Sequence, residues 1–237
     1  SATIWCKFSN NICSVSLSKD GKNIFSKSDA QGQNHASLLN LFIEEALQHL
    51  PENITKPDAI AVSSGPGSYT GLRIGVSTAK GLCYGFGIPL ISINTFQLMA
   101  YTAIQTIENK ENTLFCPMID ARRMEVYSAF YDEKLNMVRE IKPDIISEDI
   151  YNEYLNSKCV VFFGNGMQKC RELLTHPNAV FISDINPLSD NMLYFSERAL
   201  SERRTEDVAY FEPFYLKEFQ VTTPKKKVWS FIPKDSE

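Results

Sequence analysis

The chain carries the stretch Ser63-Ser64-Gly65-Pro66-Gly67-Ser68-Tyr69-Thr70-Gly71-Leu72-Arg73 between an apolar run at residues 59–62 and a helical pattern at residues 72–86. This order predicts a buried strand, a glycine-rich loop and a helix. Gly65, Gly67 and Gly71 allow a tight turn or a close approach of the backbone to a ligand. Together with Ser68 and Arg73 they form a candidate glycine-loop site.

Such a loop could hold an anion, because the first N–H groups of the following helix are free to bind it. A P-loop, however, needs a lysine directly after its last glycine, and Leu72 and Arg73 stand there instead. A dinucleotide fingerprint needs Gly-x-Gly-x-x-Gly, whereas these glycines are residues 65, 67 and 71. Taken alone, the loop favours a structural turn over a nucleotide site.

The composition is that of an ordinary globular protein. The 237 residues are 43% hydrophobic and 22% charged, which is enough for one large domain or two small ones. We find neither a long apolar run typical of a membrane span nor the pattern of a signal peptide, and therefore expect a cytoplasmic chain without membrane contact.

The charge argues against tight binding of nucleic acid by this chain alone, since its formal net charge is -4. One basic run, Lys225-Lys226-Lys227, precedes Trp229 near the C-terminus. It could touch phosphates, but a solvated tail is the favoured interpretation.

The residues that usually perform catalysis or bind metal are sparse. The three histidines, His35, His49 and His176, lack the spacing of a zinc site, and the six cysteines lack Cys-x-x-Cys spacing. Ser68 directly follows a glycine rather than lying midway between two, as a nucleophile elbow requires. We therefore predict no metal site, no catalytic residue and six reduced thiols.

Two halves of the chain repeat one order of elements: three meander strands, then helix, strand, helix, strand, helix. In the second half these include a helix at 148–155, a helix at 167–174 and a helix at 190–203. The repeat predicts an α/β, two-lobed fold of the actin-like, ribonuclease-H-like type, each lobe a mixed sheet with flanking helices. We place the division between residues 1–108 and residues 109–237.

The helices predicted at 34–50 and 72–86 have more apolar or smooth surface than one sheet can cover. The second has a face without charge whose small residues permit close approach of another helix. The candidate partner interface comprises His35, Leu38, Leu41, Phe42, Ile74, Ser77, Thr78, Gly81 and Gly85. The alternative is that neighbouring elements of the same lobe cover both faces.

Residues 64–82, which begin Ser64-Gly65-Pro66-Gly67, closely resemble the hallmark of the TsaB (YeaZ) family, in the glycoprotease-like branch of the actin-like superfamily. Three further segments match: Asp120-Ala121-Arg122-Arg123-Met124-Glu125-Val126-Tyr127, Phe163-Gly164-Asn165-Gly166 and Tyr215-Leu216-Lys217-Glu218-Phe219. The resemblance therefore covers most of the chain.

This resemblance implies a role in forming N6-threonylcarbamoyladenosine at position 37 of tRNAs that read ANN codons. In that family a paralogue, TsaD, is the catalytic subunit, TsaB is its non-catalytic partner and TsaE is an ATPase. ATP and metal are thus expected on the partner subunits and no cofactor on this chain. The family pairs with TsaD, or with itself, through its first two long helices, and tRNA is expected to be contacted only indirectly.

Three positions bear on what the resemblance implies about metal and nucleotide binding. The paralogue's two metal-binding histidines correspond here to Thr95 and Met99, which are poor ligands for such a metal. Lys7 stands where the family usually has an acidic residue, which further disfavours binding of a magnesium nucleotide. The competing hypothesis is an enzyme, either a metal-dependent glycoprotease-like peptidase or an actin-like sugar kinase.

Overall fold

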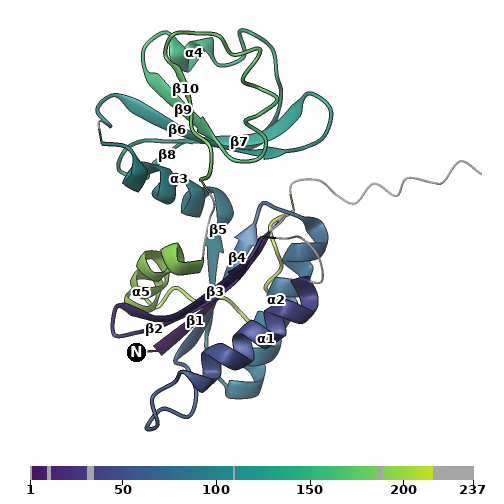
Figure 1. Ribbon diagram of the computed structural model, residues 1–237, viewed down its shortest axis with the longest axis vertical. Coiled ribbons are helices and arrows are strands. Elements are labelled where there is room, and N and C mark those ends of the chain that lie inside the picture. Colours follow the sequence, from purple (N-terminus) through teal and green to yellow (C-terminus); the bar gives the residue numbers. More distant parts are fainter. Residues whose placement is uncertain (1, 10–11, 31–34, 109, 186–188, 216–237) are drawn as a thin grey trace, which may run out of the picture.

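The computed structural model describes residues 2–9, 12–30, 35–108, 110–185 and 189–215. It forms two lobes, each built on a five-stranded sheet (Figure 1). The first sheet contains β1 (Ala2–Ser9), β2 (Ile12–Lys19), β3 (Lys22–Asp29), β4 (Ala59–Gly65) and β5 (Leu90–Asn94). The second contains β6 (Thr113–Asp120), β7 (Glu125–Tyr131), β8 (Met137–Ile145), β9 (Cys159–Phe163) and β10 (Ala179–Phe181). The predicted two-lobed α/β fold is confirmed.

The two sheets have the same topology. Their strand orders are β3-β2-β1-β4-β5 and β8-β7-β6-β9-β10. In each, the first strand of the lobe is antiparallel to the second and parallel to the fourth. The predicted repeat of element order is thus confirmed for the strands, which have the same order in both sheets.

Helices cover both faces of the first sheet. Helices α1 (His35–Gln48) and α2 (Tyr69–Phe86) lie side by side on one face, and α5 (Leu193–Ser201), preceded by the short 3-10 helix η1 (Ser189–Met192), lies on the other (Figure 1). Alternation along β1 explains this arrangement: Ile4 packs under α1 and α2, whereas its neighbour Trp5 packs on the side of α5.

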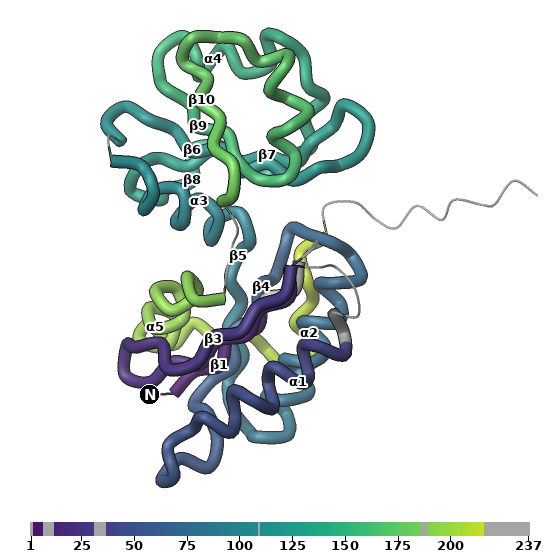
Figure 2. Tube along the Cα trace, viewed as in Figure 1, coloured from purple at the N-terminus to yellow at the C-terminus, as the bar shows by residue number. Residues whose placement is uncertain are grey.

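Helix α3 (Thr95–Thr106) lies between the lobes, as the chain trace shows (Figure 2). Phe96 packs in the core of the second sheet, while Leu98 packs with Trp5 and Phe195 in the core of the first. One helix therefore contributes to the cores of both lobes. The other face of the second sheet is covered by α4 (Asn152–Leu155) and the segment at 164–174.

The prediction of a helix at 167–174 is wrong, because this segment forms successive turns. Met167, Cys170 and Leu174 are buried with spacings of three and four residues, which is also the spacing of a helix. Its hydrogen bonds do not form a continuous helical series: Cys170 N to Met167 O and Leu173 N to Cys170 O join residues three apart, and Leu174 N to Cys170 O joins residues four apart. The helix predicted at 148–155 is shortened to Asn152–Leu155.

The predicted division between residues 1–108 and 109–237 falls between α3 and β6. Although α5 comes after the second sheet in the chain, it packs on the first sheet, where Phe195 meets Ile91. A backbone bond from Glu206 N to Leu90 O (2.8 Å) also returns the chain to β5. The C-terminal part of the described chain is therefore built into the first lobe.

Candidate partner interface and glycine loop

The glycine loop joins β4 to α2 as the sequence predicts. Ser68 caps the helix, since its Oγ accepts a hydrogen bond from Gly71 N (3.3 Å). This cap starts the helix at Tyr69, three residues before the predicted start, because the first turn includes residues of the loop itself.

The chain's own C-terminal segment crosses this loop. Phe214 N donates to Ser64 O (2.8 Å), and the Tyr215 ring lies 5.0 Å from that of Tyr69. Gly65 has a φ of +108°, and a Cβ added there would lie 2.8 Å from Phe214 O. Gly65 is therefore required by the close approach of residues 214–215, and Gly67 lies half-buried beside it.

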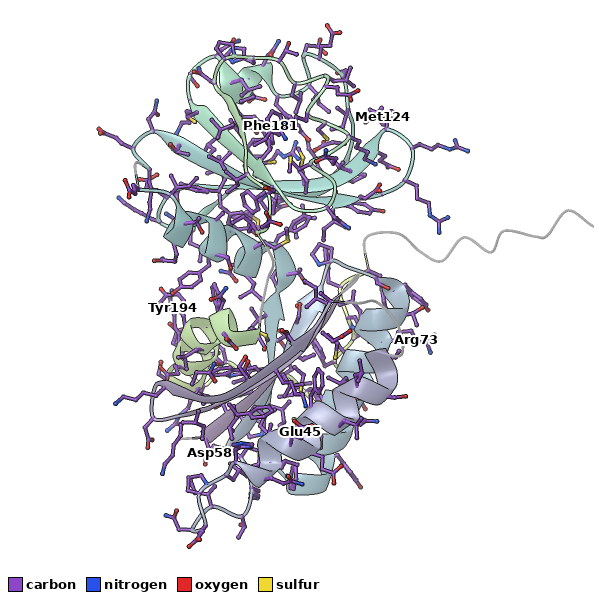
Figure 3. The ribbon with its side chains drawn as sticks, viewed as in Figure 1. Glu45, Asp58, Arg73, Met124, Phe181 and Tyr194 are labelled. Carbon is purple, nitrogen blue, oxygen red and sulfur yellow. The ribbon has the colours of Figure 1, made fainter. Side chains whose placement is uncertain are left out.

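Arg73 lies on the exposed edge of α2 and points away from the body of the first lobe (Figure 3). Its guanidinium stacks over the Tyr69 ring, 5.5 Å from the ring centre. Lys80, two turns farther along the same edge, donates to the carbonyl oxygens of Ala209 and Phe211 (3.1 and 2.9 Å). The cationic edge of α2 thus anchors the C-terminal segment.

The uncharged face of α2 is open. Ser77, Gly81 and Gly85 are exposed, and Ile74 and Thr78 are half-buried. A Cβ added at Gly81 or at Gly85 would find no atom within 4 Å among the described residues. Glycine in a helix costs about 0.5–1 kcal/mol relative to alanine, so two of them on an open face are not explained by packing within this lobe.

The predicted interface residues on α1 differ in how far they are buried. Leu41 is 51% exposed and Leu38 is half-buried, so both retain free surface. Phe42 is only 5% exposed and packs in the core under the Lys27 ammonium group, which lies 5.0 Å from its ring centre. Phe42 therefore belongs to the core rather than to the open surface. The side chains of His35 and Lys7 lie outside the described residues, as do residues 216–237.

Tyr84 is an interface candidate that is absent from the predicted interface residues. On a helical wheel Tyr84 lies on the polar edge of α2 with Arg73 and Lys80. Its side chain is 86% exposed and lies beside Gly81 and Gly85. Large exposed aromatic side chains are common anchors in interfaces. Its position next to two helical glycines is the signal in the sequence that could have identified it.

Thr95 and Met99 lie in the first turns of α3, between the lobes. Thr95 is 1% exposed, and its Oγ1 shares a hydrogen bond with Ser63 Oγ (2.8 Å). Met99 is 4% exposed, and its methyl group would lie 2.6 Å from a Cβ added at Gly164. Thr95 and Met99, the two positions that the resemblance compares with metal-binding histidines, are thus packed side chains.

The described residues contain no group of three or more histidine, cysteine, aspartate or glutamate side chains arranged to hold a metal ion. Five of the six cysteines are buried and Cys159 is half-buried, and all six are free thiols. Burial raises the pKa of Cys83 and Cys170 to about 11. These two thiols are therefore protonated at neutral pH.

The chain matches the model of the family described as TsaD, tRNA N6-adenosine threonylcarbamoyltransferase, over residues 28–220. It is 29% identical over 214 residues to the tRNA threonylcarbamoyladenosine biosynthesis protein TsaB of Escherichia coli, covering 86% of this chain and 90% of that protein. It is 35% identical over 119 residues to TsaB of Haemophilus influenzae, covering 50% of this chain and 49% of that protein.

The fold has a match among solved structures. A Pseudomonas aeruginosa protein, described as similar to the peptidase YeaZ, superimposes with a TM-score of 0.79 at 21% identity, covering 92% of this chain and 100% of that one. None of the helices among the described residues is both long and apolar enough to cross a membrane. The family match over most of the chain, with TsaB proteins as its relatives, shows that this chain belongs to the TsaD family, on its TsaB (YeaZ) branch.

Proposed function

We propose that this chain is a non-catalytic subunit of the machinery that forms N6-threonylcarbamoyladenosine at position 37 of tRNAs reading ANN codons. Its relatives carry the name of that biosynthesis, and its family is that of the transferase itself. In this role it is a scaffold and activator of a TsaD-like catalytic paralogue, acts together with a TsaE-like ATPase, and works in the cytoplasm.

The observation that carries the proposal is the open face of α2. Gly81 and Gly85 leave room for another backbone, since an added Cβ at either meets no atom of the described chain within 4 Å. Tyr84 projects beside them, and Leu41 of α1 adds an exposed apolar side chain. A helix of the paralogue can therefore approach α2 closely and bury both of these side chains. A second copy of this chain is the competing occupant of the same face.

The absence of catalysis in this subunit is part of the proposal. Thr95 is bonded to Ser63 and Met99 fills the space next to Gly164, so these two side chains are not arranged as metal ligands. The glycine loop has residues 214–215 lying across it rather than an open approach to its backbone. We place ATP and metal on the partner subunits accordingly.

The test is a substitution that fills the open face. We expect Gly81→Arg to abolish co-purification with the TsaD-like paralogue while the chain stays folded, because its side chain projects from α2 where the partner approaches. Asn156→Arg is the matched control, since Asn156 is exposed at the end of α4 in the second lobe and the substitution adds the same charge.

Co-purification is measured by affinity capture of the tagged chain and quantified by densitometry, with circular dichroism as the check of folding. Formation of the modified nucleoside by the reconstituted subunits is the second readout. Undiminished capture by Gly81→Arg would refute this interface. Equal loss with Asn156→Arg would show that added charge, rather than the α2 face, is responsible.

A further inference from the structure

The tip of the β6–β7 hairpin presents two adjacent arginines to which the proposed function gives no role. Arg122 and Arg123 are exposed, and Met124 beside them is 41% exposed. Figure 3 places Met124 on the same side of the molecule as Arg73 of the first lobe, at the outer end of the second sheet. The hairpin therefore extends a cationic tip from the second lobe toward solvent.

The backbone of this tip is in an unusual conformation. Arg122 has a φ of +71° and Arg123 a φ of +47°. Glycine, asparagine and aspartate are the residues that usually adopt positive φ, because other side chains clash with the backbone there. Two consecutive arginines in this region are strained, and strain of this kind persists where the surrounding structure holds it and is found at ligand-binding sites.

A clamp of polar contacts holds the strained tip. Asp120 Oδ1 accepts a hydrogen bond from Arg122 N (2.7 Å), and Asn165 Oδ1 accepts one from Asp120 N (3.1 Å). Lys169 Nζ donates to Asp120 Oδ1 (2.6 Å) and to Arg123 O (2.8 Å). The hydrogen bond from Lys169 also lowers the pKa of the Asp120 carboxyl, so this carboxyl is charged at neutral pH. The backbone of the tip is thereby fixed.

The guanidinium groups of Arg122 and Arg123 take no part in this clamp. The contacts at Arg122 and Arg123 are made by their backbone N and O atoms. Among the residues that the structure describes, the ion pairs of the second lobe are Arg139 with Asp144 and Lys169 with Asp120, and neither includes a hairpin arginine. A rigid tip thus carries two guanidinium groups that are available to a ligand.

We propose that Arg122 and Arg123 bind backbone phosphates of tRNA when the chain is part of its assembly. The guanidinium fork matches phosphate oxygens with two parallel hydrogen bonds, and a fixed backbone reduces the entropy lost on binding. With a net charge of -4 the chain alone binds RNA weakly, whereas in the assembly the same two contacts add to those of the catalytic subunit. The inference rests on the proposed function, and it replaces the expectation that tRNA is contacted only indirectly.

The test uses the complete assembly of this chain with the TsaD-like paralogue, and an unmodified transcript of a tRNA that reads an ANN codon. Binding is measured over a series of KCl concentrations for the double variant Arg122→Glu, Arg123→Glu. The matched control is Lys22→Glu, Lys142→Glu, since both lysines are exposed and the change in net charge is the same. We expect the hairpin variant to bind tRNA at least about tenfold more weakly, with the salt slope lower by about one per lost phosphate contact. The control stays within about threefold of the wild type, since it removes charge but no contact.

A second variant separates binding from folding. Arg122→Asn, Arg123→Gly places residues that tolerate positive φ at the same two positions. We expect its thermal midpoint to equal or exceed that of the wild type, while its tRNA affinity falls as in the glutamate variant. A purely structural role for the arginines would instead lower the midpoint and leave affinity unchanged.

Three other outcomes would overturn the inference. If both hairpin variants bind tRNA as tightly as the lysine control, the arginines do not contact RNA. If they lose the paralogue instead of tRNA, the hairpin is a protein contact and the inference is wrong. If the wild-type chain does not bind the paralogue at all, the proposed function fails and this inference fails with it.

Discussion

The two lobes share a strand order and differ in the segment after the fourth strand of each sheet. After β4, Gly65 leads into α2, a helix of 18 residues. After β9, Gly164 leads into a run of turns at 164–174. Both glycines have similar φ values, +108° and +97°, so the chain leaves the two strands in the same way and then diverges.

The difference gives the lobes different surfaces. In the first lobe, α2 buries one side against its sheet and leaves an uncharged outer face that the described residues do not cover. In the second lobe the run of turns supplies Lys169 and Asn165, which hold the β6–β7 hairpin. A repeated topology thus provides an open, uncharged helix face on one lobe, which we propose docks a partner, and a fixed cationic tip on the other.

The largest effect that tests this comparison is expected from Gly164→Ala. An added Cβ would lie 2.3 Å from Met118 O and 2.6 Å from the Met99 methyl group, at a φ of +97°. Because the backbone of β6 cannot yield without disturbing its sheet, we expect a loss of about 4 kcal/mol in the free energy of unfolding. Chemical denaturation, followed by both fluorescence and circular dichroism, measures it. A loss below about 1 kcal/mol would show that this strand end is not closely packed.

A smaller loss is expected from Gly65→Ala, at the equivalent strand end of the first lobe. The added Cβ would lie 2.8 Å from Phe214 O and 3.0 Å from a methyl group of Leu72. The Leu72 side chain can rotate and residues 214–215 can shift, so we expect about 2 kcal/mol. Gly87→Ala is the control, since Gly87 also has positive φ (+62°) but an added Cβ meets no atom of the described residues within 4 Å. If Gly65→Ala and Gly87→Ala lower the free energy of unfolding equally, residues 214–215 do not pack tightly against the loop.

The smallest effect, and one of opposite sign, is expected from Gly81→Ala. The added methyl meets no atom of the described chain within 4 Å and improves the helix propensity of α2. We expect the free energy of unfolding to rise by about 0.5–1 kcal/mol, as measured by urea denaturation of the isolated chain. A destabilised Gly81→Ala chain would mean that part of the chain itself covers this face.

The strands could be predicted from sequence because an alternation of apolar and polar residues, or a short continuous apolar run, is read directly from neighbouring residues. The sequence pattern predicts strands at 125–131 and 159–163, which are the bounds of β7 and β9. It also predicts that α2 turns Leu72, Val76, Ala79 and Cys83 toward its sheet, and all four are buried. The prediction of a helix at 167–174 failed because apolar residues spaced three and four apart also arise in consecutive turns. The local spacing of apolar residues does not distinguish a helix from consecutive turns.

The interface could be predicted only in part, because exposure depends on residues far away in the chain. Leu41 and Phe42 are neighbouring apolar residues of α1, yet the first is 51% exposed and the second is buried. Nothing in the local sequence indicates that residues 207–215 return to α2, where Lys80 holds them. The return of α5 to the first sheet depends likewise on contacts with Ile91 and Trp5 that are distant in sequence.

The most direct test of the central claim is amide hydrogen exchange of this chain with and without the TsaD-like paralogue. We predict that binding slows exchange in α2 around residues 77–86 and in the outer part of α1, and leaves the turns at 164–174 unchanged. Protection that bypasses α2 and falls on the edge strand β8 or elsewhere on the second lobe would contradict the account.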